Sequence, residues 1–170
     1  MGAVVVRRGV RADTAAIHAL YTDVARIPGG LAREPDEITQ SYIEEFVAHS
    51  LADGLLFVAE LAGMQGLAGE LHAYRNGLRK FSHVLGSLTI AVHPLAQGRG
   101  IGRRLFDQLL SDVRSDRPEI SRIELAAQES NQRAIALYES VGFRREGRFE
   151  RGIRGPAGDA EADIPMSWLR

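Results

Sequence analysis

The sequence has no cysteine, and Lys80 is the one lysine among its 21 basic residues. The absence of cysteine excludes a disulfide framework, a thiolate metal site and a sulfur nucleophile. No apolar run approaches the roughly 20 residues of a membrane span, and the N-terminal MGAVVVRRGV becomes charged too early for a signal peptide. Because the formal net charge is −1, neither a nucleic acid nor an anionic membrane is indicated as a partner. We therefore expect a cytoplasmic protein whose partners are determined by a specific site.

The apolar periodicity predicts one mixed α/β domain over residues 1–170. With 45% apolar residues, the chain is long enough to bury one sizeable core. The predicted elements are a strand at 3–8, helices at 11–25 and 36–51, a hairpin at 54–74 that turns at Ala62-Gly63, a strand at 83–92, a helix at 100–115, a strand at 121–128, a helix at 130–143 and two strands within 144–169. Asp13 is predicted to cap the first helix. The strand, helix and strand from 83 to 128 form a crossover unit, so two parallel strands are expected in a mostly antiparallel sheet with helices on both faces.

Three glycines at alternate positions mark the start of the central helix. The stretch reads Gln97-Gly98-Arg99-Gly100-Ile101-Gly102-Arg103-Arg104. Such a cluster exposes backbone N–H groups at a helix N-terminus, which favours a phosphate ligand, and the arginines add forked donors. The spacing fits neither the dinucleotide fingerprint G-x-G-x-x-G nor a Walker loop, which needs Gly-Lys-Ser/Thr. A glycine-rich turn that binds nothing is the plainer alternative.

This stretch closely resembles the Q/R-x-x-G-x-G/A signature of the GCN5-related N-acetyltransferases (the GNAT family), which cradles the pyrophosphate of acetyl-coenzyme A (acetyl-CoA). A second stretch, NQRAIALYESVGF at 131–143, is similar to the family's later motif N-x-x-A-x-x-L-Y-x-x-x-G-F. The order of the predicted elements also agrees, so the resemblance covers nearly the whole chain. It implies the GNAT fold, with acetyl-CoA as cosubstrate and no metal.

The resemblance implies roles for individual residues. The two parallel strands are expected to splay apart around the pantetheine arm, with the N–H of Ile90 polarising the thioester carbonyl and Val92 bonding the pantetheine amides. Tyr138 matches the usual general acid, which protonates the departing thiolate; the alternative is that it only packs its helix against the sheet. Asn131 and Arg133 are expected near the cofactor, although they could be no more than polar residues at a helix N-terminus. The residues expected to bind acetyl-CoA are Leu88, Ile90, Val92, Gln97, Gly98, Arg99, Gly100, Ile101, Gly102, Arg103, Asn131, Arg133 and Tyr138.

The resemblance does not identify the general base. Family members that acetylate protein lysines often carry a glutamate four residues before the oxyanion position, and that position here is Gly86. Glu70, His83 and Glu124 are candidates, directly or through water, and a solvated or salt-bridged role is the alternative for each carboxylate. A free α-amine, with a pKa of about 8, loses its proton more easily than a lysine amine, with a pKa of about 10.4. The missing glutamate therefore favours an α-amine substrate.

The segment LRKFSHVLGSLTIAV and the end of the chain look like the branch of the family that contains bacterial N-acetyltransferases of amino acids and related small amines. On this resemblance Arg33, Glu70, Arg79 and His83 are candidates to bind the acceptor, although an exposed arginine is usually only solvated. We expect direct acetyl transfer to a primary amine in a ternary complex. The alternatives are a protein N-terminal or lysine acetyltransferase and a non-catalytic acyl-CoA sensor. Paired dimers are frequent in the family, and no residue pattern here requires or excludes a homodimer.

Overall fold

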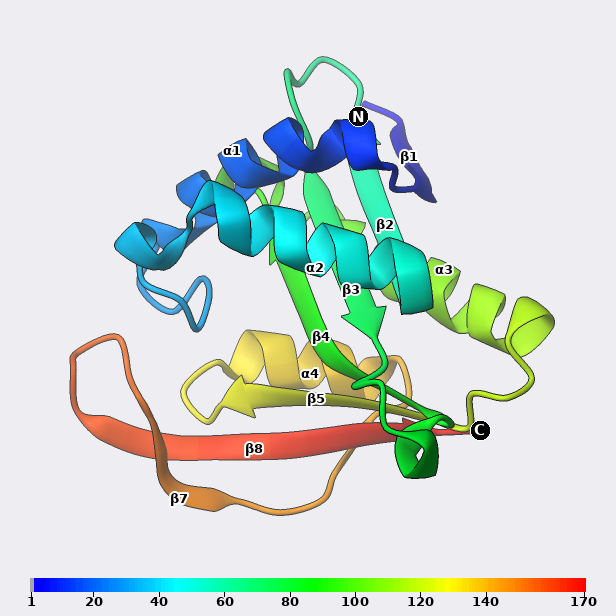
Figure 1. The fold of residues 1–170 in the computed structure, drawn as a ribbon. Helices are drawn as coiled ribbons and strands as arrows, with labels where there is room; N and C mark the ends of the chain where they lie inside the picture. The colour runs from blue at the N-terminus through cyan, green and yellow to red at the C-terminus, as the bar shows by residue number, and fades with distance from the viewer. Residues whose placement is uncertain (1) are drawn as a thin grey trace.

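The computed structural model describes residues 2–170, which form an eight-stranded mixed sheet with α-helices on both faces (Figure 1). In chain order the elements are β1 (Val4–Arg8), α1 (Thr14–Ala25), α2 (Gln40–Asp53), β2 (Gly54–Leu61), β3 (Gly69–Tyr74), β4 (Val84–Val92), α3 (Ile101–Asp116), β5 (Arg122–Gln128), α4 (Gln132–Ser140), β6 (Arg144–Arg145), β7 (Phe149–Arg154) and β8 (Ala160–Leu169). The strand order is β1-β2-β3-β4-β5-β8-β6, and β7 also pairs with β8. Short 3₁₀ turns precede α1, α2, β4 and α3.

The β4–β5 pair is parallel and the other strand pairs are antiparallel, as the crossover predicted. Helices α1 and α2 cover one face of β2 to β4, and α3 lies on the opposite face (Figure 1). Alternate residues of β2 supply the two resulting cores. Leu55 and Phe57 belong to the apolar cluster that contains α3, and Leu56 and Val58 belong to the cluster of α1 and α2.

The predicted apolar faces of the helices are the buried ones. Helix α3 buries Ile101, Leu105, Leu109 and Val113, and α1 buries its predicted face in the same way. Helix α2 begins at Gln40, later than expected, because the hydroxyl of Thr39 accepts a hydrogen bond from the N–H of Tyr42 and caps the helix there. No helix of residues 2–170 combines the length and apolar composition that crossing a bilayer requires.

Two local predictions were wrong. The side chain of Asp13 does not cap α1; its carboxylate accepts from the N–H of Val10 and pairs with Arg7 at 2.8 Å. The cause is the 3₁₀ turn at Arg11–Asp13, which runs directly into α1. The second strand of the hairpin begins at Gly69, because residues 62–68 form a longer connection than a tight turn.

A bulge in β4 separates the two parallel strands. The β3–β4 register shifts beside Ser87, so β4 accommodates an additional residue there. Ser87 has a positive φ of 48°, which residues other than glycine rarely adopt. The strands β4 and β5 pair before the bulge, at residues 84–85 and 122–123. Beyond it, β4 stays paired with β3 and β5 with β8, so the two parallel strands diverge.

Leu105 is fully buried between α3 and the sheet, so it tests this packing. Leu105→Ala should lower the free energy of unfolding by about 2–5 kcal/mol, because it removes buried methyl groups and leaves a cavity. The matched control Leu95→Ala, at a side chain that is 77% exposed, should change it by less than about 0.5 kcal/mol. Urea unfolding measures both variants, and equal effects would contradict the position of α3.

Candidate active site

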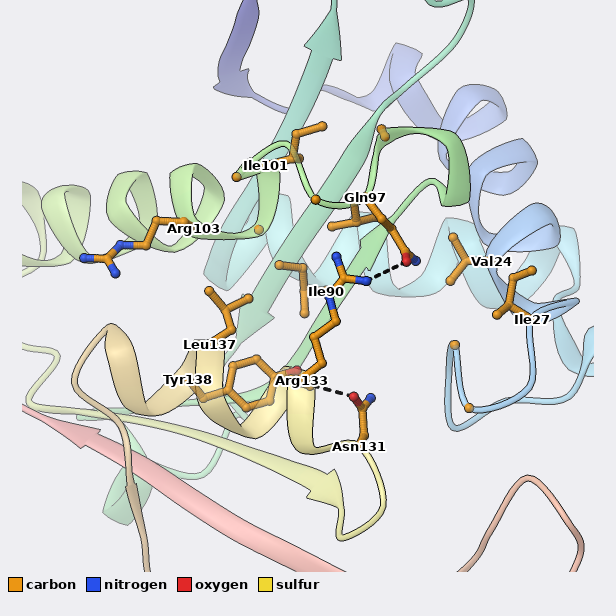
Figure 2. A pocket seen from close by; sticks show the side chains of 18 of the residues that line it. Val24, Ile27, Ile90, Gln97, Ile101, Arg103, Asn131, Arg133, Leu137 and Tyr138 are labelled. Atoms are coloured by element: carbon orange, nitrogen blue, oxygen red, sulfur yellow. Dashed lines mark hydrogen bonds between the residues drawn. The ribbon is translucent and has the colours of Figure 1, made fainter.

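A cleft of about 450 Å³ lies beside the C-terminal half of β4, between the start of α3, helix α4 and the α1–α2 loop (Figure 2). Eleven of the thirteen residues predicted to bind acetyl-CoA line it: Ile90, Val92, Gln97, Gly98, Gly100, Ile101, Gly102, Arg103, Asn131, Arg133 and Tyr138. Of the other two, Arg99 is exposed and Leu88 lines neighbouring pockets. The two motifs, which lie far apart in the sequence, therefore meet in one cleft.

The three glycines before α3 are required for different structural reasons. Gly98 and Gly100 have φ values of 76° and 75°, in the left-handed region that glycine enters without strain. A Cβ at either position would meet nothing within 4 Å, so the backbone there is open to a ligand. A Cβ at Gly102 would lie 2.9 Å from Leu137 Cδ2 and 3.6 Å from Ile90 Cδ1. Gly102 lines the cleft as predicted, and it also lets α3 pack closely against α4 and β4.

The N-terminus of α3 has the properties of an anion site. Gly100 is its N-cap and has no side chain to bond the first N–H groups of the helix, which stay free for a ligand. The helix dipole adds about half a positive charge at this end. Arg133 donates to Gln97 Oε1 at 2.9 Å, joining α4 to the glycine turn, whereas the guanidinium of Arg103 points away from this turn and bonds to Asp107 and Ser140 (Figure 2). These groups fit a pyrophosphate.

Two N–H groups of β4 face the gap between the parallel strands. The N–H of His93 bonds to the carbonyl of Ala68. Because bonded pairs alternate along an antiparallel ladder, Ile90 and Val92 direct their N–H groups to the opposite edge of β4. That edge faces β5, which has diverged at this level. Both groups are therefore available to a ligand instead of to the sheet.

Tyr138 packs in the core and also lines the cleft. Its ring meets Phe106 edge-on, with centroids 5.5 Å apart, and lies near Phe143. Burial raises the pKa of Tyr138 to about 12, so the phenol keeps its proton at neutral pH. Asn131 caps α4, since its Oδ1 accepts from the N–H of Ala134 at 3.1 Å, and its amide nitrogen stays free to donate (Figure 2).

A second pocket, of about 260 Å³, adjoins the cleft; we call it the Arg33 pocket. Strand β4 contributes Ile90 and Val92 to the cleft and residues 87–89 to the Arg33 pocket. The α1–α2 loop likewise contributes residues 27–30 to the first and 31–33 to the second. The guanidinium carbon of Arg33 lies 3.8 Å from the centroid of the Tyr42 ring, which holds a positive charge at this pocket.

Glu70, one of the candidate bases, is completely buried next to the Arg33 pocket. Its Oε2 accepts from the hydroxyl of Tyr21 at 2.6 Å, and its Oε1 lies 3.0 Å from Nδ1 of His72. His72 lines the Arg33 pocket and stacks on Phe46. His72 was not among the predicted site residues, although the alternation in GELHAY, residues 69–74, puts it on the same face of β3 as Glu70.

The structure does not bring the remaining candidates to these two pockets. Neither pocket includes Arg79 or His83, which precede the bulge at the paired end of β4. Seven residues of strand, roughly 20 Å, separate His83 from Ile90. Glu124 lies on β5 in a third pocket and forms a salt bridge with Arg122 at 2.5 Å. This is the salt-bridged role that was the alternative to a role as general base. Within residues 2–170, no three His, Asp or Glu side chains are grouped to hold a metal ion.

Comparison with known sequences agrees with the two motifs. A family model described as the acetyltransferase (GNAT) family matches residues 14–143. N-alpha-acetyltransferase RimI of Mycobacterium tuberculosis is 44% identical over 72 residues, 42% of each chain. L-amino acid N-acyltransferase MnaT of Escherichia coli is 26% identical over 138 residues, 81% of this chain and 78% of that one. The match thus spans less than half of the mycobacterial relative and most of the second.

Solved structures share the whole fold. A GNAT acetyltransferase from Streptococcus pneumoniae aligns with a TM-score of 0.87 at 22% identity, over 99% of this chain and 100% of that one. The structure of yncA from Salmonella typhimurium, solved with its cofactor acetyl-CoA, aligns with a TM-score of 0.78 at 22% identity, over 98% and 94%. The chain belongs to the GNAT family of acetyl-CoA-dependent N-acetyltransferases, and its mixed sheet is the fold of that family.

Gly100→Ala should weaken acetyl-CoA binding at least about tenfold, because its Cβ would enter the open space of the cradle where the phosphate binds. Gly63→Ala is the matched control: Gly63 has a φ of 85°, equally open surroundings and a place in the turn after β2. Calorimetric titration with acetyl-CoA should give the Gly63→Ala variant the wild-type Kd. A wild-type Kd for Gly100→Ala as well would exclude the cradle.

Proposed function

We propose that the protein transfers the acetyl group of acetyl-CoA to the primary amine of a small molecule, an amino acid or a related amine, by direct attack in a ternary complex. The observation that carries this proposal is the pair of N–H groups at Ile90 and Val92, between the glycine cradle and the Arg33 pocket. Acetyl-CoA supplies an activated thioester. The residues of this chain bind and orient the two reactants and assist the proton transfers between them and solvent.

The cleft offers complementary groups for the successive parts of acetyl-CoA. The pyrophosphate fits the cradle of Gly98 and Gly100, with Arg133 beside it, and Arg103 would reach it by leaving Asp107 and Ser140. The N–H of Val92 suits a pantetheine amide, and the N–H of Ile90 donates to the thioester oxygen, where negative charge develops during attack. Since the β4 contacts are main-chain contacts, the conformation of β4 matters more here than the identity of its side chains.

Tyr138 is the proposed donor to the departing sulfur. Its pKa of about 12 lies roughly three to four units above that of a thiol, so complete proton transfer to a thiolate is uphill. The phenol instead donates a hydrogen bond that strengthens as charge grows on sulfur. This role needs a protonated tyrosine at working pH, which its burial provides.

The Arg33 pocket supports a small, carboxylate-bearing acceptor. Its volume of about 260 Å³ is below the range of about 300–1,000 Å³ typical of sites for drug-sized ligands. Arg33 supplies the forked donors that a carboxylate binds best. The likeness to L-amino acid N-acyltransferase MnaT supports an amino acid, and the likeness to N-alpha-acetyltransferase RimI makes a protein N-terminus the second candidate. Both acceptors present an α-amine.

Tyr138→Phe should lower kcat by about 100-fold or more, because it removes the donor to sulfur, and should leave the Kd for acetyl-CoA within about twofold. Thiol release measures kcat, and calorimetry measures the Kd. Across pH, wild-type kcat should show no decrease between pH 8 and pH 10, since Tyr138 ionises at a pKa of about 12. A wild type that binds acetyl-CoA without turnover of any amine would instead be a non-catalytic sensor.

Thiol release should be greatest with free amino acids when these are compared with polyamines, aminoglycosides and short peptides. Arg33→Gln should then raise the KM of the amino acid about tenfold or more and leave that of acetyl-CoA unchanged, because a charged hydrogen bond contributes about 1.5–3 kcal/mol. The exposed Arg11, in the turn before α1, gives the control Arg11→Gln. Faster turnover of peptides than of amino acids would shift the assignment to a protein N-terminus.

A further inference from the structure

Three polar side chains are buried beside the Arg33 pocket. Tyr21 of α1 and Glu70 of β3 are 0% exposed, and His72 of β3 is 2% exposed. A buried carboxylate is strongly unfavourable unless its oxygens are bonded, and here each oxygen has a partner: Tyr21 at 2.6 Å and His72 at 3.0 Å. The three groups therefore form one connected network. The function proposed above gives the network no role.

The network determines which nitrogen of His72 carries hydrogen. A carboxylate only accepts hydrogen bonds, so Nδ1 of His72 donates to Glu70. Burial and the charge of Glu70 hold the pKa of Tyr21 well above its ordinary value, so its hydroxyl stays protonated and donates to the other oxygen. In the neutral imidazole the lone pair then lies on Nε2.

Nε2 of His72 is accessible from the Arg33 pocket. His72 lines this pocket, and its ring is held in plane by Phe46, with centroids 4.0 Å apart and an interplanar angle of 14°. Among the completely enclosed side-chain N and O atoms of residues 2–170, only Gln128 Oε1 has no hydrogen-bond partner. Nε2 of His72 also has no partner among these residues, so it is not completely enclosed. It is therefore exposed to the pocket.

The strand register sets His72 next to the reacting centre. His72 pairs directly with Thr89 across β3 and β4, so their side chains lie on the same face with Cβ atoms about 5 Å apart. Ile90, whose N–H is the proposed donor to the thioester oxygen, follows Thr89. An amine that enters through the Arg33 pocket toward this oxygen therefore passes Nε2 of His72.

We propose that His72 is the catalytic base that takes the proton from the attacking amine, and that Glu70 and Tyr21 are positioning residues that orient it; this rests on the function proposed above. The amine nitrogen forms a bond to the thioester carbon as the carbon–sulfur bond breaks, and the amine proton passes to Nε2. The thiolate leaves hydrogen-bonded to Tyr138 and takes a proton from solvent. His72 returns its proton to solvent, so one proton is released and one is taken up.

The surroundings of His72 favour a transient positive charge on its ring. The titratable or charged groups that surround it are Tyr21 from α1, Tyr42 from α2, Arg33 from the loop, and Glu70 and Tyr74 on β3, while His49 of α2 stacks on Tyr74 and does not contact His72. Burial raises the pKa of both Tyr21 and Tyr42, so both stay neutral. Glu70 is the negative charge in contact with the ring, and Arg33 is the opposing positive one.

His72→Asn tests the base, because the amide nitrogen of asparagine can still donate to Glu70 while Nε2 is lost. With acetyl-CoA and an equimolar mixture of the twenty common L-amino acids, kcat should fall about 100-fold or more at pH 7, with the Kd for acetyl-CoA within about twofold. Added imidazole should restore part of the rate. His49→Asn is the matched control, since His49 stacks on Tyr74 and does not touch Glu70, and it should keep the wild-type rate. Wild-type kcat in His72→Asn would overturn the proposal and leave the acetyltransferase function intact.

The positioning residues are tested by the pH profile of kcat. Glu70→Gln removes the anion that stabilises the charged ring, so the loss of activity on the acid side should move to lower pH. Tyr21→Phe should move that loss of activity to higher pH, because Glu70 keeps its charge and loses the hydrogen bond from the phenol. A merely structural role would lower the rate of both variants without moving the profile, and that result would overturn the positioning role.

Nitrogen NMR of the histidine-labelled wild type separates this inference from the proposed function, because it needs neither turnover nor a variant that folds. In the neutral ring the His72 signals should show Nδ1 protonated and Nε2 unprotonated. The opposite tautomer would overturn the inference even if the enzyme is active. If the tautomer is as expected and acetyl-CoA binds, yet no amine is acetylated, the proposed function fails and the inference fails with it.

Discussion

Two parallel strands that pair only at their first residues and then diverge are the constraint on which the site depends. In a continuous sheet the N–H groups of Ile90 and Val92 would be hydrogen-bonded to the neighbouring strand, since backbone donors in a core are almost always paired. The residue added to β4 at Ser87 turns the strand away from β5, which stays paired with β8 along its other edge. The glycine turn and α4 then close around the backbone that the sheet has released. The strained φ of Ser87 is thus tolerated where the chain needs a functional gap.

The alternation of β3 and β4 divides the reaction between the two faces of the sheet. Glu70, His72 and Thr89 point toward α1 and α2, where the Arg33 pocket lies. Ile90 and Val92 point toward α3 and α4, where the glycine cradle lies. Their N–H groups lie in the plane between, which allows reactants bound on opposite faces to meet at one edge of β4. A register error of one residue would exchange the two faces and destroy both sites.

The predictions from sequence succeeded where a feature depends on local backbone or on helical period. Gly98 and Gly100 are needed for their own torsions, and the apolar face of α3 repeats regularly, so both could be read directly. The prediction at Asp13 failed although Arg7 and Val10 are near in sequence, because a 3₁₀ turn precedes the helix and lets these two residues bind the carboxylate. The packing of α4 that excludes a side chain at Gly102 is distant in sequence and could not be predicted. His83 looked close to the reaction in sequence because the bulge and the length of β4 are invisible there. His72 was missed because its partners come from α1 and from two residues earlier on β3, a contact that no single motif records.

The α1–α2 loop, which supplies residues 27–30 to the cleft and 31–33 to the Arg33 pocket, forms a shared wall between two binding events. When one reactant orders one end of this short segment, binding of the other reactant costs less conformational entropy of the loop. Such coupling is reciprocal, so each reactant strengthens the other by the same factor whichever binds first. Amino-acid changes in the loop that touch neither reactant therefore alter the cooperativity between them, and the loop is a place where evolution can adjust acceptor choice without disturbing the cradle.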